Sequence, residues 1–544
     1  MAHRLSSSYF APSDYKASKH ASLDVPGSVF MISSAGNVLR LPIPSKSPRD
    51  PLAWSWARRI AAFCSLEFYS VVASFLVNIP GTLMPAFQSE FGTENTAPFS
   101  VAALPSTMTL FMAVGYLVNI PLSTAIGRRP VVIMSAAIAA ASTLWAGFAG
   151  SFAQLLVAFA LQGFAVAGAI SMCLTMVLDA TFIHERPYAL SLYWCVGSVI
   201  IKALTLPLPL ITEITTDWRP IYEIWFLVIL IALVLVICFV PETYFIRPPV
   251  AFDGRVLVQS GTEKVRIYDD WFLVHETGGM KPLPEAPLRS AWFDQLKIRR
   301  AEGTQWWSML ATFAQMPFCF INPLIFWVSL LNACLLGTVI FLNLLQPGAL
   351  MGFVGIGNSG LINTYLGVSG AIGALLALPL SGPTTAWLTK YLSLRSGGVR
   401  HAEVYLPGFA IPTIAGCLSV GMAAVAVDRE WSPLWQYVAA TLSMISYNTG
   451  NVATALWVTE AFPRWASAAL SSVLFTANAV AFILGLKLTP WVRGVHIMPQ
   501  SYVWMGLLAV MGLVAVPVAF WGRTVRQYIQ GRWSFSEKGA LRPQ

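Results

Sequence analysis

Twelve long apolar stretches constrain this chain more than any other feature of its sequence. Each holds enough consecutive apolar residues to cross about 30 Å of hydrocarbon as a helix. The runs are continuous rather than alternating with period two, which disfavours an outer-membrane barrel. We therefore expect an all-α membrane protein with twelve transmembrane helices. The predicted spans lie near residues 60–84, 100–123, 130–150, 153–177, 188–211, 221–240, 321–343, 362–388, 404–426, 434–457, 466–489 and 502–521.

The composition points the same way. Hydrophobic residues make up 56% of the chain and charged residues only 11%, which is outside the range of soluble domains. The formal net charge is +9. In a membrane protein a basic excess is typical of cytoplasmic loops that face anionic lipid, so we expect a lipid bilayer and no nucleic acid as partner. Lys and Arg gather in the loops on the side of the two chain ends, which predicts that both termini are cytoplasmic.

Polar segments divide the spans into two groups of six. Residues 1–57 are Ser-rich and lack an early apolar run, which predicts a disordered cytosolic tail rather than a signal peptide. We expect an N-terminal six-helix bundle at 58–240 and a C-terminal one at 316–522, joined by a polar cytoplasmic linker at 241–315. Residues 523–544 form a second predicted cytosolic tail.

A short repeat relates the two groups. Gly115 precedes Pro121-Leu122-Ser123 at the end of the second span, and Gly373 precedes Pro379-Leu380-Ser381 at the end of the eighth. Equivalent positions in two halves indicate a 6+6 duplication, with two pseudo-symmetric six-helix bundles. Transporters with such parallel repeats bind substrate between the halves, near the middle of the membrane.

Two adjacent arginines, Arg128 and Arg129, separate the second and third spans. A buried unpaired charge is costly, so this pair predicts a turn at the membrane surface. The pattern G-x5-P-L-S-x3-G-R-R resembles the signature loop of the major facilitator superfamily. Further segments resemble its fungal branch of twelve-span drug-and-metabolite transporters, the drug:proton antiporter group. They are DPLAWSWARR (50–59), VPETYFIRPP (240–249), GGVRHAEVYLP (397–407) and WVTEAFPRWA (457–466).

The resemblance implies the major facilitator fold and a secondary transporter that works by alternating access on a small molecule. It also implies that the basic turn acts as a latch, because charge pairs formed in only one arrangement of the halves bias the equilibrium between them. The family turn normally carries an aspartate where this chain has Thr124, so the partner must be another acid. The candidate latch residues are Gly115, Arg128, Arg129, Asp179 and Glu185.

Two further departures concern proton coupling. Phe159 stands in the fourth span where the family usually has an arginine, and the glycine- and proline-rich antiporter motif of the fifth span is reduced to Gly197, Pro207 and Pro209. Proton coupling is therefore one expectation. A facilitator, or coupling through other residues, is the alternative.

Ionisable residues inside spans are costly and mark functional candidates. Glu67 in span one can carry a coupling proton or bind a cationic group, or it can reach cytosolic water near the inner end. Lys202 in span five can neutralise an anionic substrate or a partner acid, or its stem can snorkel toward the interface. The other cavity candidates are Asn78, Trp327, Asn332, Asn448 and Asn451. For the amides the alternative is hydrogen bonding between helices, and for the tryptophan a place at the membrane interface.

Catalytic motifs are missing from the sequence. The six histidines fall in tails or loops, and no HExxH, GxSxG or Walker spelling occurs. We expect neither an enzyme nor a cofactor or metal site. The sequence predicts a monomeric transporter of the plasma membrane that exports a small organic molecule, such as a fungal secondary metabolite or toxin. The alternative is an importer or facilitator of a small polar or anionic solute.

Overall fold

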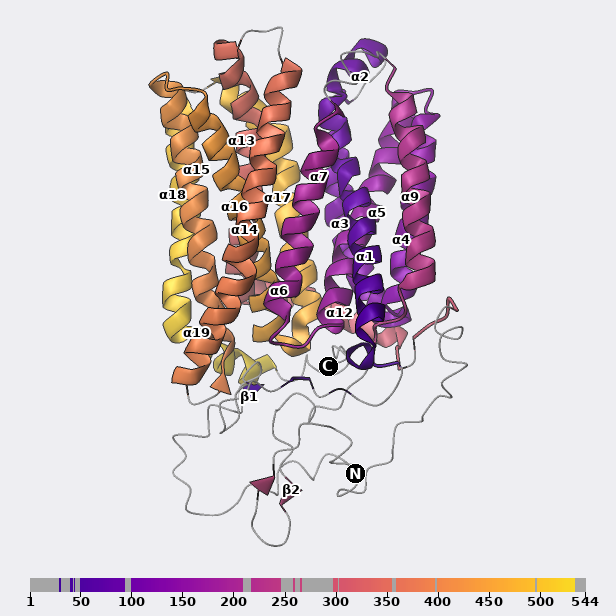
Figure 1. The fold of residues 1–544 in the computed structure, drawn as a ribbon, viewed down its shortest axis with the longest axis vertical. Coiled ribbons are helices and arrows are strands. Elements are labelled where there is room, and N and C mark those ends of the chain that lie inside the picture. Colours follow the sequence, from indigo (N-terminus) through magenta and orange to yellow (C-terminus); the bar gives the residue numbers. More distant parts are fainter. Residues whose placement is uncertain are drawn as a thin grey trace.

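The computed structural model describes residues 29–30, 40–42, 44, 49–92, 99–208, 217–245, 258–259, 265–266, 297–301, 303–354, 359–396, 399–494 and 497–533. Long helices run side by side in two groups, indigo to magenta on one side and orange to yellow on the other (Figure 1). Most of the predicted tail at 1–57 and linker at 241–315, and residues 534–544, lie outside the described residues. Those assignments stay predictions.

The first group of helices, here called the first half, follows a 3-10 turn, η1 (Pro51–Ala53). Its helices are α1 (Trp56–Thr82), α2 (Met84–Phe91), α3 (Ala103–Ile126), α4 (Arg128–Gly147), α5 (Phe152–Asp179), α6 (Arg186–Ser191), the π-helical turn η2 (Leu192–Val196), α7 (Gly197–Thr205) and α9 (Arg219–Phe239). The segments α6, η2 and α7 form one continuous helix with a π-turn inside it.

The second half begins after α12 (Trp306–Ile321), which lies at the lower end of the bundle in Figure 1. Its elements are α13 (Pro323–Val354), α14 (Ser359–Arg395), η5 (Ala402–Phe409), α15 (Ala410–Asp428), α16 (Leu434–Ala461), η6 (Pro463–Trp465), α17 (Ala466–Gly494), α18 (Ile497–Leu513) and α19 (Ala515–Trp533). Two pairs of two-residue antiparallel strands complete the described elements: β1 (Val29–Phe30) with β4 (Val399–Arg400), and β2 (Val258–Gln259) with β3 (Val265–Arg266).

Eleven helices among the described residues are long and apolar enough to cross a membrane. The segment predicted at 434–457 is a helix too, α16, with 28 residues, but its mean hydropathy falls below that of these eleven. Its polar side chains are buried inside the protein rather than facing lipid, so the helix does not need an apolar surface. With α16 included, the part of the chain that the structure describes holds the twelve long helices that the sequence predicts. The buried polar residues of α16 include Ser446, Asn448, Thr449, Asn451, Thr454 and Glu460.

The repeated glycines mark equivalent helix contacts in the two halves. A Cβ on Gly115 would lie 2.6 Å from the Cβ of Ala167 and 2.9 Å from the carbonyl oxygen of Phe164, both in α5. A Cβ on Gly373 would lie 3.0 Å from the carbonyl carbon of Thr441 in α16. The second and fourth long helices of each half therefore approach at a glycine, as small residues allow in membrane proteins.

The two halves meet along two symmetric seams. The second long helix of the first half, α3, packs on the fifth of the second half, α17, while α7 in the fifth of the first half packs on α14, the second of the second half. The end of the bundle at which α12 lies is called the α12 end below, and the opposite end, which carries α2, the α2 end (Figure 1).

The close approaches predict that both repeated glycines are needed for stability. Gly115→Ala and Gly373→Ala should each lower the free energy of unfolding by about 1–3 kcal/mol, because the added methyl group meets backbone that must move. Gly506→Ala in α18 is the matched control, since nothing lies within 4 Å of the Cβ it would add. Thermal unfolding followed by size-exclusion chromatography in detergent measures the difference. Equal stability of all three variants would contradict the glycine contacts.

Candidate functional site

A cavity of about 310 Å³ lies between the halves. The first half contributes α1, α3, α5, η2 and α7 to its walls, and the second half contributes α13, α16 and α17. The volume lies in the range of sites that bind small organic molecules. Its ionisable lining residues are Glu67, Lys202, Tyr116, Tyr193 and Tyr447.

Glu67 lies in α1 and is only 8% exposed. Neither of its carboxylate oxygens has a hydrogen-bond partner among the described residues. The carboxylate lies against Gly197, where an added Cβ would be 2.6 Å from Oε1. Gly197 directly follows the π-turn η2, a local distortion that is frequent at functional sites. The fifth long helix therefore leaves a space that the Glu67 carboxylate occupies.

Lys202 follows Gly197 by five positions on α7 and lines the same cavity. Its alkyl stem reaches toward the second half. A Cβ on Gly370 of α14 would lie 3.3 Å from the Lys202 Cε and 3.5 Å from its Cδ. Among the described residues, no ion pair joins Lys202 to Glu67.

Three of the predicted amides line the cavity. Asn332 donates from Nδ2 to the Oδ1 of Asn451 at 3.3 Å, across α13 and α16. Asn451 itself donates to the carbonyl oxygen of Tyr447 at 2.8 Å, and Asn78 donates to that of Ser74 at 3.2 Å. Each of these Nδ2 groups thus has a partner within the protein, and the amides give the cavity a polar wall.

Two other candidates lie outside the cavity lining. Trp327 packs edge-on against Phe409 and Trp457, and its Nε1 donates to the carbonyl oxygen of Met511 at 2.7 Å. The ring is therefore occupied by packing inside the second half. Asn448 accepts a hydrogen bond from the Ser198 hydroxyl at 2.7 Å, which joins α16 to α7 across the halves.

Aromatic residues were the main omission of the sequence-based prediction of the cavity. Tyr193 and Trp194 in η2 and Tyr447 in α16 all line it. The hydroxyl groups of Tyr193 and Ser70 are 2.8 Å apart, and the rings of Trp194 and Tyr447 meet edge-on with centroids 6.2 Å apart. The π-turn that presents Tyr193 and Trp194 has no sequence signature, so periodicity alone could not find them.

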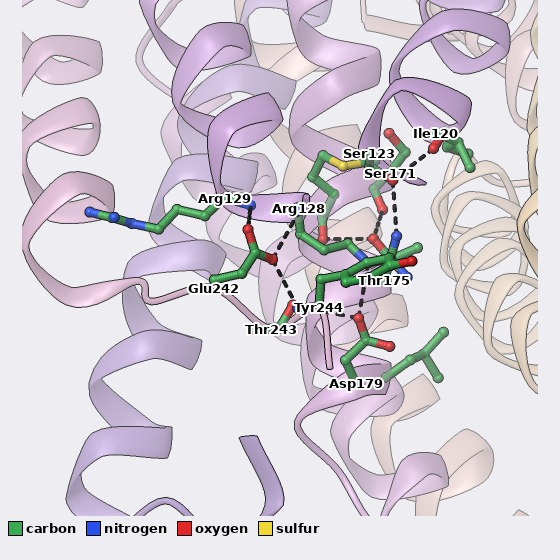
Figure 2. A network of polar contacts seen from close by, with 12 residues as sticks. Ile120, Ser123, Arg128, Arg129, Ser171, Thr175, Asp179, Glu242, Thr243 and Tyr244 are labelled. Carbon is green, nitrogen blue, oxygen red and sulfur yellow. Dashed lines mark hydrogen bonds and ion pairs between the residues drawn. The ribbon is translucent and has the colours of Figure 1, made fainter. Parts of the chain in front are cut away.

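The basic turn joins α3 to α4, and both of its arginines are buried against partners in the protein (Figure 2). Arg128 is 1% exposed. Its Nε donates to the Asp179 Oδ2 at 2.9 Å and its Nη1 to the Ser123 Oγ at 2.9 Å. Burial is tolerated because the charge is paired. Of the two candidate acids, Asp179 contacts Arg128, whereas Glu185 lies 3.9 Å from Arg59.

Glu242, which follows α9, holds the backbone of this turn. Its carboxylate accepts the N–H groups of Arg128 at 3.0 Å, Arg129 at 3.1 Å and Tyr244 at 2.8 Å (Figure 2). Gly127 has a φ of +105°, and a Cβ there would lie 2.5 Å from Glu242 Oε2, so glycine is required. Burial raises the pKa of Glu242, while the three N–H groups and the Arg128 charge act in the opposite direction. The sequence signal that could have identified Glu242 is its position in the VPETYFIRPP segment, which resembles the family.

The Arg129 side chain points away from that of Arg128 (Figure 2). Its Nη1 donates to the carbonyl oxygen of Lys297 at 3.0 Å and its Nη2 to that of Ile237 at 2.9 Å. Arg129 thus ties the turn to the end of α9 and to the segment that precedes α12. These contacts of the two arginines all lie within the first half and the chain that follows it.

A second buried cluster joins the halves at the α12 end. Glu460 in α16 accepts a hydrogen bond from Arg186 of α6, in the other half. Its second oxygen accepts from Arg400 at 2.6 Å, and Arg400 also donates to the Tyr405 hydroxyl at 2.8 Å. Burial alone would lower the pKa of Arg400, but Glu460 and Tyr405 raise it above its usual value. Two arginines, one from each half, thus share the Glu460 carboxylate.

Hydroxyl groups also join the halves near this end, at Ser191, which follows Arg186 on α6. Ser191 of α6 lies 2.7 Å from Ser381 of α14, hydroxyl to hydroxyl, and donates to the Leu378 carbonyl oxygen at 2.9 Å. Ser381 belongs to the second copy of the repeated P-L-S spelling. The cavity is thus bounded toward the α12 end by contacts between the halves.

Comparisons with known proteins agree with this architecture. The family model of the Major Facilitator Superfamily matches residues 66–486. An uncharacterized MFS-type transporter of Schizosaccharomyces pombe is 21% identical, with 95% of this chain and 92% of that protein covered. The solved structure of the proton:xylose symporter XylE bound to 6-bromo-6-deoxy-D-glucose matches with a TM-score of 0.57 and 12% identity, covering 90% of this chain and 98% of that chain. At that identity the likeness concerns the fold alone. The chain therefore belongs to the Major Facilitator Superfamily, a family of membrane transporters rather than enzymes.

Proposed function

We propose that this protein moves a small organic molecule across the membrane by alternating access, with the central cavity as its binding site. The observation that carries the proposal is the cavity's position between two halves that are bonded together at the α12 end. A site whose walls come from both halves opens to one side or the other when the halves rock against each other. The Arg186–Glu460 pair and the Ser191–Ser381 contact must then break and re-form in each cycle.

We further propose that the chain belongs to the fungal drug-and-metabolite branch, acts as a monomer in the plasma membrane and exports a secondary metabolite or toxin. The segments around Arg128, Glu242 and Glu460 support the branch. The distribution of Lys and Arg supports cytoplasmic termini, with the α12 end on the cytoplasmic side. In that orientation the described arrangement is closed toward the cytoplasm.

Import or facilitated passage of a small polar or anionic solute is the second candidate. Lys202 favours it, because a cationic side chain lining the cavity attracts an anionic group. Transport assays in sealed vesicles, with and without a pH gradient and across a metabolite panel, separate the two candidates. Failure of every compound to cross would contradict both.

Coupling to protons is proposed at Glu67. Its carboxylate has no hydrogen-bond partner in the described part of the chain and lines the cavity, so it can take up a proton or bind the cationic group of a substrate. If the proton and the cationic substrate bind to this carboxylate in turn, the proton crosses the membrane in one direction and the substrate in the other. Lys202 and the three cavity tyrosines are the other titratable groups of this site.

Glu460→Gln should open the α12 end. The substitution leaves Arg186 and Arg400 with a neutral partner, so the closed arrangement loses its cross-half charge pair. Spin labels at the exposed positions Tyr188 and Leu394, one on each half, should report longer distances in double electron–electron resonance. Glu403→Gln is the matched control, because its partner Arg526 lies in the same half, at 2.5 Å. Identical distance distributions in Glu460→Gln and wild type would contradict the gate.

The Arg128–Asp179 pair should carry a large coupling energy. Breaking a buried pair costs about 3–5 kcal/mol, so a double-mutant cycle with Arg128→Met and Asp179→Leu should be strongly non-additive in the free energy of unfolding. The cycle with Arg59→Met and Glu185→Leu serves as control, since that pair is partly exposed and 3.9 Å apart, and about 1 kcal/mol or less is expected of it. Equal coupling in the two cycles would refute a special role for the buried pair.

Transport measurements test whether the basic turn acts as a latch. Arg128→Ala/Arg129→Ala should insert into the membrane but transport more slowly, because the balance between arrangements shifts. The rate is measured in vesicles at matched protein abundance. Wild-type transport by this variant would remove the latch from the mechanism.

Glu67→Gln should abolish any pH-gradient dependence of transport. The amide keeps the shape of the carboxylate but cannot gain or lose the proton. Exchange of substrate across proteoliposomes at saturating concentration should persist, while uptake driven by a pH gradient is lost. Glu223→Gln, at an exposed position of α9, is the control and should behave like wild type. Gradient-driven uptake that survives in Glu67→Gln would place coupling at another residue.

A further inference from the structure

The cavity contains one acidic and one basic side chain that do not pair with each other. Most other buried charges of the described structure are neutralised by a partner: Arg128 by Asp179, Arg186 and Arg400 by Glu460, and Arg526 by Glu403. Glu67 has no hydrogen-bond partner on either oxygen within the described chain. A buried charge without a partner is costly, so a site that holds such a carboxylate together with a partly buried lysine is adapted to a ligand that supplies partners for both.

Glycines provide the space for both groups. Gly197 leaves room for the Glu67 carboxylate, and Gly370 leaves room for the Lys202 stem. The two spaces come from different helices in different halves, α7 and α14. A side chain at either glycine would compete with the charged group for its place. The absence of a side chain at Gly197 and at Gly370 thus allows the two charged side chains to take these positions.

The Glu67 carboxylate and the backbone of Lys202 lie at different heights along α7. Gly197, beside the carboxylate, and Lys202 are five positions apart on α7, which corresponds to about 7–8 Å along the helix axis. The cavity lining between and around them is largely apolar and aromatic. It includes Val71, Ile201, Leu336, Val339, Trp194 and Tyr447.

We propose that the cavity binds a zwitterion with an apolar body, its ammonium group at Glu67 and its carboxylate at Lys202. This inference rests on the proposed function and names the substrate class of the same site. No ion pair joins the two side chains among the described residues, so a plain α-amino acid, which carries both charges on one carbon, fits the site less well than a ligand whose charges lie apart. An ω-amino acid or a short apolar peptide has its charges at opposite ends and spans the distance.

The proposal also accounts for the involvement of both halves. Glu67 and Lys202 belong to the first half, but the Lys202 stem lies against Gly370 of the second half. Rocking of the halves changes the surroundings of the lysine more than those of the carboxylate. The carboxylate end of the ligand is therefore the end that senses the arrangement of the halves.

The test compares 6-aminohexanoate with its isomer norleucine and with two singly charged analogues, hexylamine and hexanoate. Isothermal titration calorimetry on the full-length protein in nanodiscs gives the dissociation constants. We expect 6-aminohexanoate to bind about tenfold or more tightly than each of the other three, since each charge-assisted contact contributes about that factor. Equal affinity for norleucine, or no binding by any of the four, would overturn the proposal.

Two variants assign the ends of the ligand. Glu67→Gln should weaken 6-aminohexanoate about tenfold and leave hexanoate unchanged, while Lys202→Met should weaken 6-aminohexanoate equally and leave hexylamine unchanged. Glu223→Gln and Lys390→Met neutralise exposed charges outside the cavity and serve as controls. Affinities that respond in the same way to both cavity variants would contradict the assignment of the two ends.

Transport separates this inference from the function on which it rests. If 6-aminohexanoate binds as described but does not cross reconstituted vesicles, the site is right and the transport function is wrong. If a singly charged compound crosses and the zwitterion shows no advantage, the protein is a transporter and the inference is wrong.

Discussion

The ion pair between Arg186 and Glu460 is the interaction on which the described arrangement of the two halves depends. It is buried, it joins α6 to α16, and Arg400 shares the same carboxylate. A charge pair of this kind stabilises one arrangement only, because separation of the halves takes Arg186 away from Glu460, while Arg400 and Glu460 stay together in the second half. The hydroxyl contact between Ser191 and Ser381 adds directional bonding beside it. Together these contacts hold the α12 end closed beneath the cavity.

The buried and partly buried charges discussed above fall into two classes with different consequences. Those at the α12 end are matched by partners on neighbouring helices, as Arg128 is by Asp179 and by the Ser123 hydroxyl. Those in the cavity, Glu67 and Lys202, are not matched to each other. In a low-dielectric interior the first class fixes structure, whereas the second is available to a ligand or a proton. The cost of burying a charge without a partner thus distinguishes the residues that stabilise the fold from those that we assign to transport.

Much of the fold could be predicted from the sequence, because span length and hydrophobic continuity are set by the bilayer. The polar helix α16 shows where hydropathy is weakest, since its Ser, Thr, Asn and Glu residues are buried inside the protein. The repeated glycines at positions 115 and 373 indicated the duplication, and the contacts around them agree with it. The sequence named Asp179 as one of two candidate partners of the basic turn, and it does contact Arg128. The contacts of Glu242 were not predicted, because they depend on packing between segments that are distant in the sequence.

The cavity was predictable in part. Glu67 and Lys202 stood out because charges are rare in membrane spans, and both line the cavity. Trp327 was selected by residue type alone, and its packing against Phe409 and Trp457 shows that type does not determine which face of a helix a residue occupies. The aromatic side chains of η2 depend on a π-turn that shifts their direction. Local geometry of that kind follows from tertiary packing and not from periodicity.

Alternating access is the central claim, and a reversible cross-link across the α12 end tests it most directly. Ser191→Cys and Ser381→Cys, in a Cys195→Ala background, place two thiols where the two hydroxyls are 2.7 Å apart. Transport in vesicles is then measured under oxidising conditions and again after reduction. The account predicts that the disulfide abolishes transport and that reduction restores it. Unchanged transport by the fully cross-linked protein would contradict it.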